Sequence, residues 1–215
     1  MSTSPTLGLI DYGAGNLLSV HNALRSFGVE PKLVRGPDDL AGIEKIILPG
    51  VGSFGDCVAN LRTQSLWEPL REWVMADRPY FGICLGYQIL FDTSEESPGL
   101  QGLGKFRGTV KRFAAKPGLK VPHMGWNTVR IAKDGLRLWD GLPANPYFYF
   151  VHSFHPVPED DNIVAGWTDY DGPFACAIET GAIEGVQFHP ERSQDNGLRV
   201  LRGFAAPASP VPARA

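Results

Sequence analysis

Cys84 lies in a segment typical of a catalytic nucleophile. It follows the apolar run Pro79–Ile83 and has a glycine two residues before it and another two residues after it, Gly82 and Gly86. A strand that turns sharply into a helix at such a G-x-C-x-G segment forms a nucleophile elbow, here with sulfur in place of serine oxygen. The glycines let the backbone make the tight turn while the cysteine side chain projects alone. The pattern predicts covalent catalysis by Cys84, although a buried cysteine beside two packing glycines would read the same way.

A histidine and a glutamate near the end of the chain could serve this thiol. They are His189 and Glu191, separated by Pro190. Proline favours extended backbone at the residue before it, so we expect the two side chains on a strand-like segment, pointing to the same side. The glutamate would then orient the histidine as a general base for Cys84. An isolated H-x-E is common in surface loops, and its weight here comes from the elbow.

A glycine-rich loop, Pro49–Gly55, follows another apolar run and precedes a helical stretch. Its glycines allow backbone N–H groups to converge on one point. A phosphate cradle of the P-loop type would need a lysine that the loop lacks. We therefore predict an oxyanion hole formed by the N–H of Val51 or Gly52 together with that of Leu85, the alternative being an ordinary turn.

The elements around these residues alternate between strands and helices. Asn16 can cap a first helix, whose apolar positions recur at helical spacing, and further helices are expected at about 53–61 and 66–75. Near-continuous apolar strands alternating with helices indicate an α/β fold with a mostly parallel sheet and helices on both faces. In such sheets ligands bind at the carboxyl ends of the strands. The predicted strands are Leu7–Ile10, Lys32–Val34, Lys45–Leu48 and Pro79–Ile83.

The second half of the chain reads as short strands punctuated by Gly, Pro and Asp. We predict that they form an antiparallel extension of the sheet, followed by a helix over about 196–204. The catalytic domain is expected to span residues 1–205, and the Pro/Ala-rich tail 206–215 is expected to be disordered. The predicted strands are Thr109–Phe113, Asn127–Ile131, Tyr147–Val151, Ile163–Trp167, Ala175–Ile178 and Gly185–Phe188.

Composition argues against several classes of function. The 215 residues carry 20 Lys+Arg and 23 Asp+Glu with no basic run, which disfavours nucleic-acid binding. No stretch approaches the roughly 20 apolar residues of a membrane span, and the N-terminus lacks a signal sequence, so we expect a cytoplasmic protein with no membrane association. Cys57 and Cys176 are expected to be small core residues, and Glu95 and Glu96 to lie in a solvated loop.

No metal or cofactor is expected. His152 and His155 form an H-x-x-H pair. The pair lacks the H-E-x-x-H context of a zinc site.

These segments together resemble class I glutamine amidotransferases. Within that family, five segments are similar to the glutaminase subunits of imidazole glycerol phosphate synthase, and the resemblance runs from residue 7 to residue 204. It implies a flavodoxin-like domain. The five segments are Asp11–Asn16, Pro49–Gly55, His123–Asn127, Phe150–Ser153 and Gln187–Ser193.

The resemblance also implies roles for individual residues. Cys84 would attack glutamine, His189 would act as base, and Glu191 would orient it. The other implied roles are an oxyanion site at the backbone of Gly50, Val51 and Gly52, glutamine binding by Gln88 and the backbone of Ser153 and Phe154, and a partner-facing ammonia exit near Met124, Trp126 and Asn127. The sequence departs from the usual family residues at Phe154 (often Tyr), Tyr87 (often Met) and Arg192 (usually Lys).

The implied reaction is hydrolysis of L-glutamine to glutamate and ammonia. The implied partner, in a heterodimer, is a cyclase subunit that uses the ammonia to convert PRFAR to imidazole glycerol phosphate and AICAR in histidine biosynthesis. A peptidase on a similar fold and a non-catalytic subunit are alternatives, as are amidotransferases for anthranilate, guanylate or carbamoyl phosphate. An α/β-hydrolase fits less well because its acid precedes its histidine, whereas Glu191 follows His189.

Overall fold

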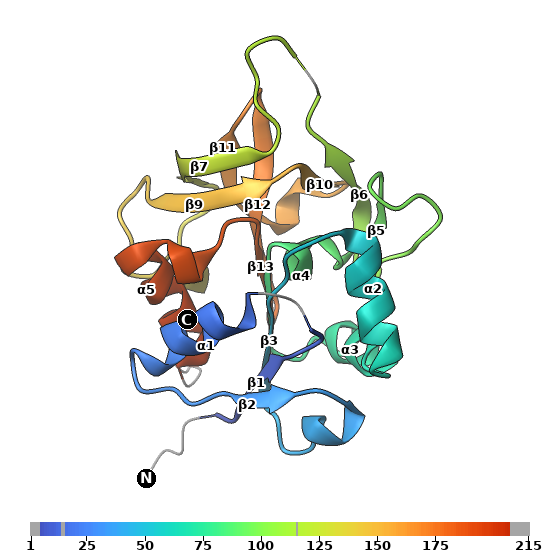
Figure 1. Ribbon diagram of the computed structural model, residues 1–215. Helices are drawn as coiled ribbons and strands as arrows, with labels where there is room; N and C mark the ends of the chain where they lie inside the picture. The colour runs from blue at the N-terminus through green and yellow to red at the C-terminus, as the bar shows by residue number, and fades with distance from the viewer. Residues whose placement is uncertain (1–4, 14–15, 115, 207–215) are drawn as a thin grey trace.

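The main sheet has eight strands in the order β2-β1-β3-β4-β13-β12-β11-β8 (Figure 1). The computed structural model describes residues 5–13, 16–114 and 116–206. The first five strands run parallel and the last three are antiparallel, which confirms the predicted parallel sheet with an antiparallel extension. The strands are β1 (Leu7–Ile10), β2 (Lys32–Val34), β3 (Lys45–Leu48), β4 (Tyr80–Ile83), β8 (Arg130–Ile131), β11 (Val164–Asp169), β12 (Pro173–Thr180) and β13 (Ile183–Val186).

One strand of the second half belongs to the parallel part, contrary to the sequence prediction. β13 runs parallel to β4, with Val186 beside Ile83, and antiparallel to β12. The β12–β13 hairpin turns at Gly181, whose φ of 58° lies in the left-handed region. Because this hairpin reverses the chain, β13 acquires the direction of β4 and joins the two parts of the sheet.

Two smaller sheets lie outside the main one. One has the order β10-β6-β5, and in the other β7 pairs with β9, so two of the predicted strands, Thr109–Phe113 and Tyr147–Val151, do not extend the main sheet as expected. The predicted strand Asn127–Ile131 is divided between the end of β7 and β8 of the main sheet. β5 and β10 were not predicted at all. β10 contains Pro156 and Pro158, which a strand tolerates at a sheet edge, where it lies. The strands are β5 (Phe91–Ser94), β6 (Phe106–Arg112), β7 (His123–Thr128), β9 (Tyr147–His152) and β10 (Phe154–Pro158).

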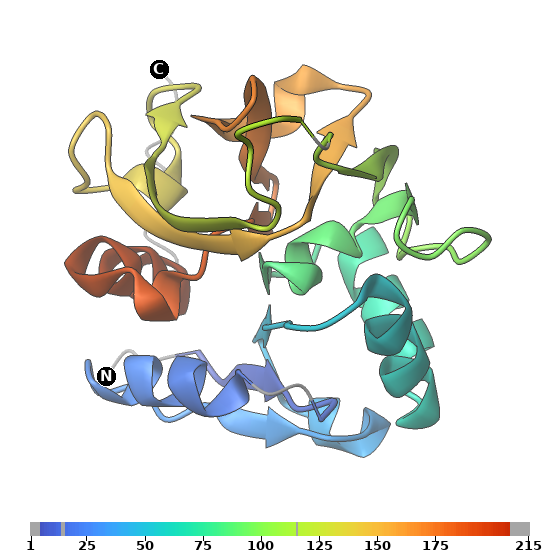
Figure 2. The ribbon, with the colours of Figure 1, turned by 45° about the horizontal axis from the view of Figure 1, so that its top comes forward.

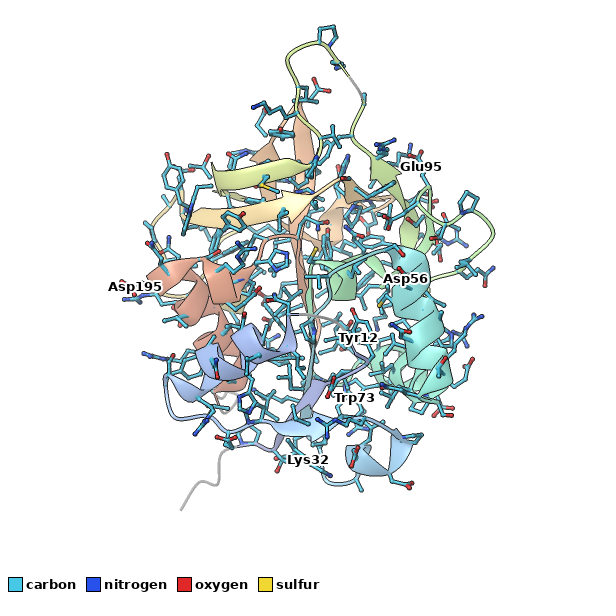
Figure 3. All side chains as sticks on the ribbon, viewed as in Figure 1. Tyr12, Lys32, Asp56, Trp73, Glu95 and Asp195 are labelled. Carbon is cyan, nitrogen blue, oxygen red and sulfur yellow. The ribbon has the colours of Figure 1, made fainter. Side chains whose placement is uncertain are left out.

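Helices cover both faces of the main sheet, as predicted. α1 and α5 pack together on one face, while α2 and α3 lie on the other (Figures 1 and 2). Each face has its own apolar core, and Tyr12 and Trp73 belong to the core on the α2/α3 side (Figure 3). The helices are α1 (Leu17–Arg25), α2 (Phe54–Thr63), α3 (Trp67–Met75), α4 (Leu85–Gln88) and α5 (Gln194–Ala205), with 3-10 turns η1 (Pro37–Leu40), η2 (Arg137–Trp139), η3 (Asp161–Ile163) and η4 (Pro190–Arg192).

The carboxyl ends of the parallel strands bring the candidate residues together. The loops after β1, β3, β4 and β13 hold Asn16, the 49–53 segment, Cys84 and His189. The backbone N–H of Cys84 donates to the carbonyl of Val186 over 2.8 Å, which links two of these loops directly. The sheet edge predicted to bind a ligand is therefore the edge where these residues meet.

The limits of the domain stay a prediction. α5 ends at Ala205, and residues 207–215 of the expected disordered tail lie outside the described residues, as do residues 14 and 15 of the loop after β1. Among the described helices, none has the length and apolar content to cross a membrane.

One buried acid lies at the opposite end of β13. Glu184 is 3% exposed, and its carboxylate lies 3.0 Å from the guanidinium of Arg137. Burial raises the pKa of Glu184 to about 7, and repulsion from Glu179 adds to this shift, while Arg137 and Lys45 oppose it. The folded protein therefore holds a proton on Glu184 at a pH where the unfolded chain releases it.

We expect Glu184→Gln to stabilise the protein at pH 8 but not at pH 4. Between the ordinary pKa of 4.5 and about 7, rising pH destabilises the native protein because only the unfolded state loses the proton freely. Gln removes this penalty, which amounts to at most about 3 kcal/mol above pH 7. Urea unfolding of both proteins at the two pH values measures the difference. A stability difference that is the same at both values would contradict the assignment.

Candidate active site

Cys84 sits in a backbone turn that its two glycines make possible. Its φ of 54° and ψ of −102° are unusual for a non-glycine residue, and such strain is common at functional positions. A Cβ on Gly82 would lie 2.3 Å from the carbonyl oxygen of Gly86, and one on Gly86 would lie 2.0 Å from that of Leu48. No larger residue fits either position without moving backbone. The packing that the G-x-C-x-G pattern predicted is therefore present.

His189 and Glu191 form a buried pair behind this turn. Nδ1 of His189 donates to Oε1 of Glu191 over 2.8 Å, and the two side chains are 1% and 0% exposed. His189 has extended backbone, but residues 190–192 form a 3-10 turn rather than the expected strand-like segment. With Nδ1 occupied by the carboxylate, Nε2 is the ring nitrogen left for the thiol, and it makes no hydrogen bond to the described part of the chain.

Burial and the neighbouring charges act on the pKa of His189 in opposite directions. Burial on its own lowers the pKa of His189, but the nearby Cys84 thiolate and the Glu191 carboxylate outweigh it and raise the pKa to about 10. The imidazole is therefore protonated near neutral pH whenever Cys84 is a thiolate. A thiolate beside an imidazolium supplies both a nucleophile and a proton donor.

Two further polar residues hold this pair in place. The side-chain N–H of Asn16 donates to Oε1 of Glu191, so Asn16 does not make the predicted side-chain cap of α1. The hydroxyl of Ser193 donates to the carbonyl of His189 over 2.7 Å and accepts from the N–H of Tyr149 over 2.9 Å. Neither role was predicted: the Asn16 contact joins segments 175 residues apart, and Ser193 links its own turn to Tyr149, 44 residues away.

A cavity of about 340 Å³ opens at Cys84. Its volume is in the range of small-molecule sites, roughly 300–1,000 Å³. It brings together every residue predicted for the oxyanion hole and for glutamine binding except Gly50. The lining residues are Val51, Gly52, Cys84, Leu85, Gln88, Glu96, Pro122, Val151, His152, Ser153, Phe154 and His189.

The predicted oxyanion loop has the conformation that glycine allows. Gly52 has a φ of 104°, in the left-handed region. A Cβ on Gly50 would lie 2.5 Å from Cβ of Leu85, so Gly50 packs beneath Leu85 instead of lining the cavity. The donor roles of the Val51, Gly52 and Leu85 N–H groups stay predictions.

Glu96 was expected in a solvated loop, and this was wrong. It lines the cavity, and its Oε2 accepts from the N–H of Phe54 at the start of α2 over 2.7 Å. A Glu-Glu pair reads as surface in the sequence because the contact that orders it comes from a segment 42 residues away. The carboxylate gives the cavity wall a negative charge.

Gln88, in the cavity lining, hydrogen-bonds to residues of two other segments. Its Nε2 donates to the carbonyl of Phe154 over 3.0 Å and to Oε1 of Gln187 over 3.1 Å. Gln187 in turn lies with its Nε2 3.5 Å from Sγ of Cys84, a contact that sequence reasoning did not select. Contact between Gln88 and a bound glutamine stays a prediction.

The histidines of the H-x-x-H pair have other partners. Nδ1 of His152 lies 2.8 Å from the carbonyl of Phe154, and Nε2 lies 3.0 Å from Nδ1 of His123. Nδ1 of His155 lies 3.3 Å from the carbonyl of Pro156. In the part of the chain that the structure describes, no three His, Cys, Asp or Glu side chains are grouped so as to hold a metal ion.

The residues predicted for the partner interface lie on β7, in the upper part of Figure 1. Met124 and Trp126 are 62% and 47% exposed, whereas Asn127 turns inward and donates to the carbonyl of Asp169 over 2.9 Å. Trp126 packs edge-on against Tyr149, whose ring also lies under the guanidinium of Arg192, 4.3 Å from its centre. An arginine at this position therefore keeps its charge close to the exposed aromatic surface.

The sequence matches the family described as glutamine amidotransferase class-I over residues 8–206. The chain belongs to this family. It is 46% identical over 198 residues to imidazole glycerol phosphate synthase subunit HisH of Moorella thermoacetica, covering 92% of this chain and 93% of that one. It is 43% identical over 205 residues to the chloroplastic imidazole glycerol phosphate synthase hisHF of Arabidopsis thaliana, covering 94% of this chain and 34% of that longer one.

Solved structures of the same fold agree with this membership. A glutamine amidotransferase crystal structure superposes with a TM-score of 0.71 at 22% identity, covering 93% of this chain and 98% of that one. PurLQS from Thermotoga maritima gives the same TM-score and identity, covering 94% and 98%. At this identity the likeness concerns the fold, and it confirms the predicted amidotransferase architecture.

We expect Glu191→Gln to lower the turnover of glutamine by a factor of about 10²–10⁴ while changing KM much less. The amide keeps the size of the side chain but removes the negative charge that helps to raise the pKa of His189. The high-pH limb of the kcat profile should therefore move to lower pH. Steady-state kinetics across pH 6–10 would test this. An effect confined to KM would show that Glu191 binds substrate instead.

Proposed function

We propose that the protein is the glutaminase subunit of imidazole glycerol phosphate synthase. In this role it hydrolyses L-glutamine and passes the ammonia to a cyclase subunit, which converts PRFAR to imidazole glycerol phosphate and AICAR in histidine biosynthesis. The observation that carries the proposal is the buried Cys84, His189 and Glu191 set at the wall of the 340 Å³ cavity. The names of the HisH relatives, at more than 40% identity over most of the chain, support the choice of pathway.

The chemistry is an acyl transfer. The Cys84 thiolate attacks the side-chain carbonyl carbon of glutamine, and backbone N–H groups of Val51 or Gly52 and of Leu85 bind the oxyanion. The His189 imidazolium gives its proton to the departing nitrogen, which leaves as ammonia, and a γ-glutamyl thioester remains. His189 then takes a proton from water, whose oxygen attacks the thioester and releases glutamate and the Cys84 thiolate.

The cavity wall offers complementary groups for the amino-acid end of glutamine. Glu96 supplies a carboxylate that suits the α-ammonium group. The backbone of Ser153 and Phe154 lines the same space and offers further hydrogen-bonding groups. Gln88 holds the Phe154 carbonyl in position, so its contribution to glutamine binding includes shaping this wall.

The partner would dock over the exposed part of β7. Met124 and Trp126 form an apolar surface there, with Arg192 close by as a cation, a combination common in protein interfaces. Docking at this surface would enclose ammonia that otherwise escapes to solvent. The expected heterodimer and the cytoplasmic location belong to the same proposal.

Replacing Cys84 with Ala should separate the two half-reactions. We expect the complex to lose glutamine-dependent synthesis and to keep ammonia-dependent synthesis within about twofold, because the nucleophile acts only in nitrogen release. Product formation from PRFAR, with glutamine or with ammonium salt as the nitrogen source, measures both. Loss of both activities would contradict the division of labour.

We further expect the glutaminase rate to depend on the state of the partner. Val51 lies between two glycines, so its peptide can rotate between presenting a carbonyl and presenting an N–H to the oxyanion site. One oxyanion donor is typically worth about 10²–10³ in rate, so activation by the liganded cyclase should be of that order. Rates of the free subunit, the complex and the complex with PRFAR or an analogue would test this. Equal rates in all three would exclude the switch.

A further inference from the structure

A continuous row of hydrogen bonds joins β7 to the nucleophile. Starting at Asn127, it passes through His123 and His152 to the carbonyl of Phe154. From that carbonyl it continues through Gln88 and Gln187 to Sγ of Cys84. None of these steps exceeds 3.3 Å except the last, which is 3.5 Å to the larger sulfur atom. The row thus spans the space between the exposed strand and the catalytic thiol.

The backbone carbonyls of Phe154 and Asp169 fix the direction of every bond in the row. The carbonyl of Phe154 can only accept, so both Gln88 Nε2 and His152 Nδ1 must donate to it. Gln88 then presents its second N–H to Oε1 of Gln187, which leaves the amide nitrogen of Gln187 facing Sγ. A flipped Gln187 amide would set two NH₂ groups against each other.

The histidine half of the row is fixed in the same way. Neutral His152 donates from Nδ1, so its Nε2 must accept from Nδ1 of His123. Nε2 of His123 then accepts from Asn127, whose amide nitrogen also donates to the Asp169 carbonyl. Burial lowers the pKa of His123 to about 4 and the pKa of His152 well below its ordinary value, so both rings are neutral near pH 7.

We propose that Gln187 is a positioning residue for Cys84, and that the row of hydrogen bonds beginning at Asn127 holds its amide N–H against the sulfur. Gln187 is 0% exposed, and its side-chain Oε1 accepts from Gln88 over 3.1 Å, so the side-chain amide has little freedom. A fixed donor on one side of Sγ stabilises the thiolate and limits the rotamers of the strained Cys84 side chain.

Asn127 lies on the same strand, β7, as the exposed residues Met124 and Trp126. Met124 and Trp126 point outward from β7, whereas His123 and Asn127 lie on its other side. A strand moved by docking on its outer side therefore moves the first members of the row directly. Removing a member far from Cys84 should change the nucleophile through Gln187, and the part of the effect that passes this way should vanish once Gln187 has been replaced.

Gln187→Met tests the first part of the proposal, because Met keeps the volume and loses the donor. This part rests on the proposed function, glutamine hydrolysis at Cys84. The primary measurement is therefore one that does not depend on that function: the rate at which iodoacetamide alkylates Cys84 at fixed pH. Burial raises the pKa of Cys57 and Cys176 to about 12, and peptide mass spectrometry would confirm that Cys84 is the labelled residue. We expect alkylation to slow about tenfold, with kcat of the complex falling similarly and KM changing less than about twofold.

A double-mutant cycle tests the rest of the row. The ring of His123 is stacked between Phe150 and Tyr170, so His123→Phe keeps the stack and removes the hydrogen bonds. We expect it to lower kcat about threefold in the wild-type background and to add nothing to Gln187→Met. Tyr170→Phe is the matched control, since it keeps the same stack and loses only a hydroxyl outside the row.

The outcomes separate cleanly. Unchanged alkylation in Gln187→Met would overturn the positioning role, and an equal effect of His123→Phe in both backgrounds would overturn the row. A rise in KM with unchanged kcat would assign Gln187 to substrate binding, and this too would overturn the positioning role. If the wild-type complex lacked glutaminase activity while the alkylation difference persisted, the proposed function would fail and the positioning role would stand.

Discussion

The packing of β4 between β3 and β13 is the constraint on which the site depends. Gly86 lets the turn after this strand come so close to β3 that an added carbon would overlap the Leu48 carbonyl oxygen, and Gly82 leaves room for the carbonyl of Gly86 in the same way. The neighbouring strands hold the turn on both sides, so Cys84 keeps a backbone conformation that an isolated segment would avoid. Everything else in the site is placed relative to that one fixed sulfur.

The charges at the site then follow from burial. A carboxylate enclosed with no cation would be unfavourable, and the protonated ring of His189 is the cation that Glu191 meets. The same ring would neutralise a thiolate formed at Cys84. Each of the three groups therefore depends on the other two for its stability, and the polar side chains around them hold the three in position. This explains why Asn16 and Ser193, from different segments, converge on this pair.

The sequence predicted the parallel strands, the helices on both faces and the grouping of Cys84, His189 and Glu191, because these leave local signals: apolar runs, helical periodicity and glycine spacing. It did not predict the direction of β13 or the separate sheets, since strand pairing is decided by distant segments. The same reason applies to Glu96, Gln187 and Asn16. Each is an unremarkable polar residue in its own segment, and its role arises from a partner between 42 and 175 positions away.

The contact between Asn16 and Glu191 joins residues separated by 175 positions. Cys84, the proposed nucleophile, is likewise synthesised well before His189 and Glu191, the residues proposed to activate it. A chain still growing on the ribosome, lacking β13 and the turn behind it, would have an unfinished sheet and an unpaired thiol. The growing chain would therefore not hydrolyse glutamine, and hydrolysis would begin only after the segment from β13 onward had been released and had packed against α1.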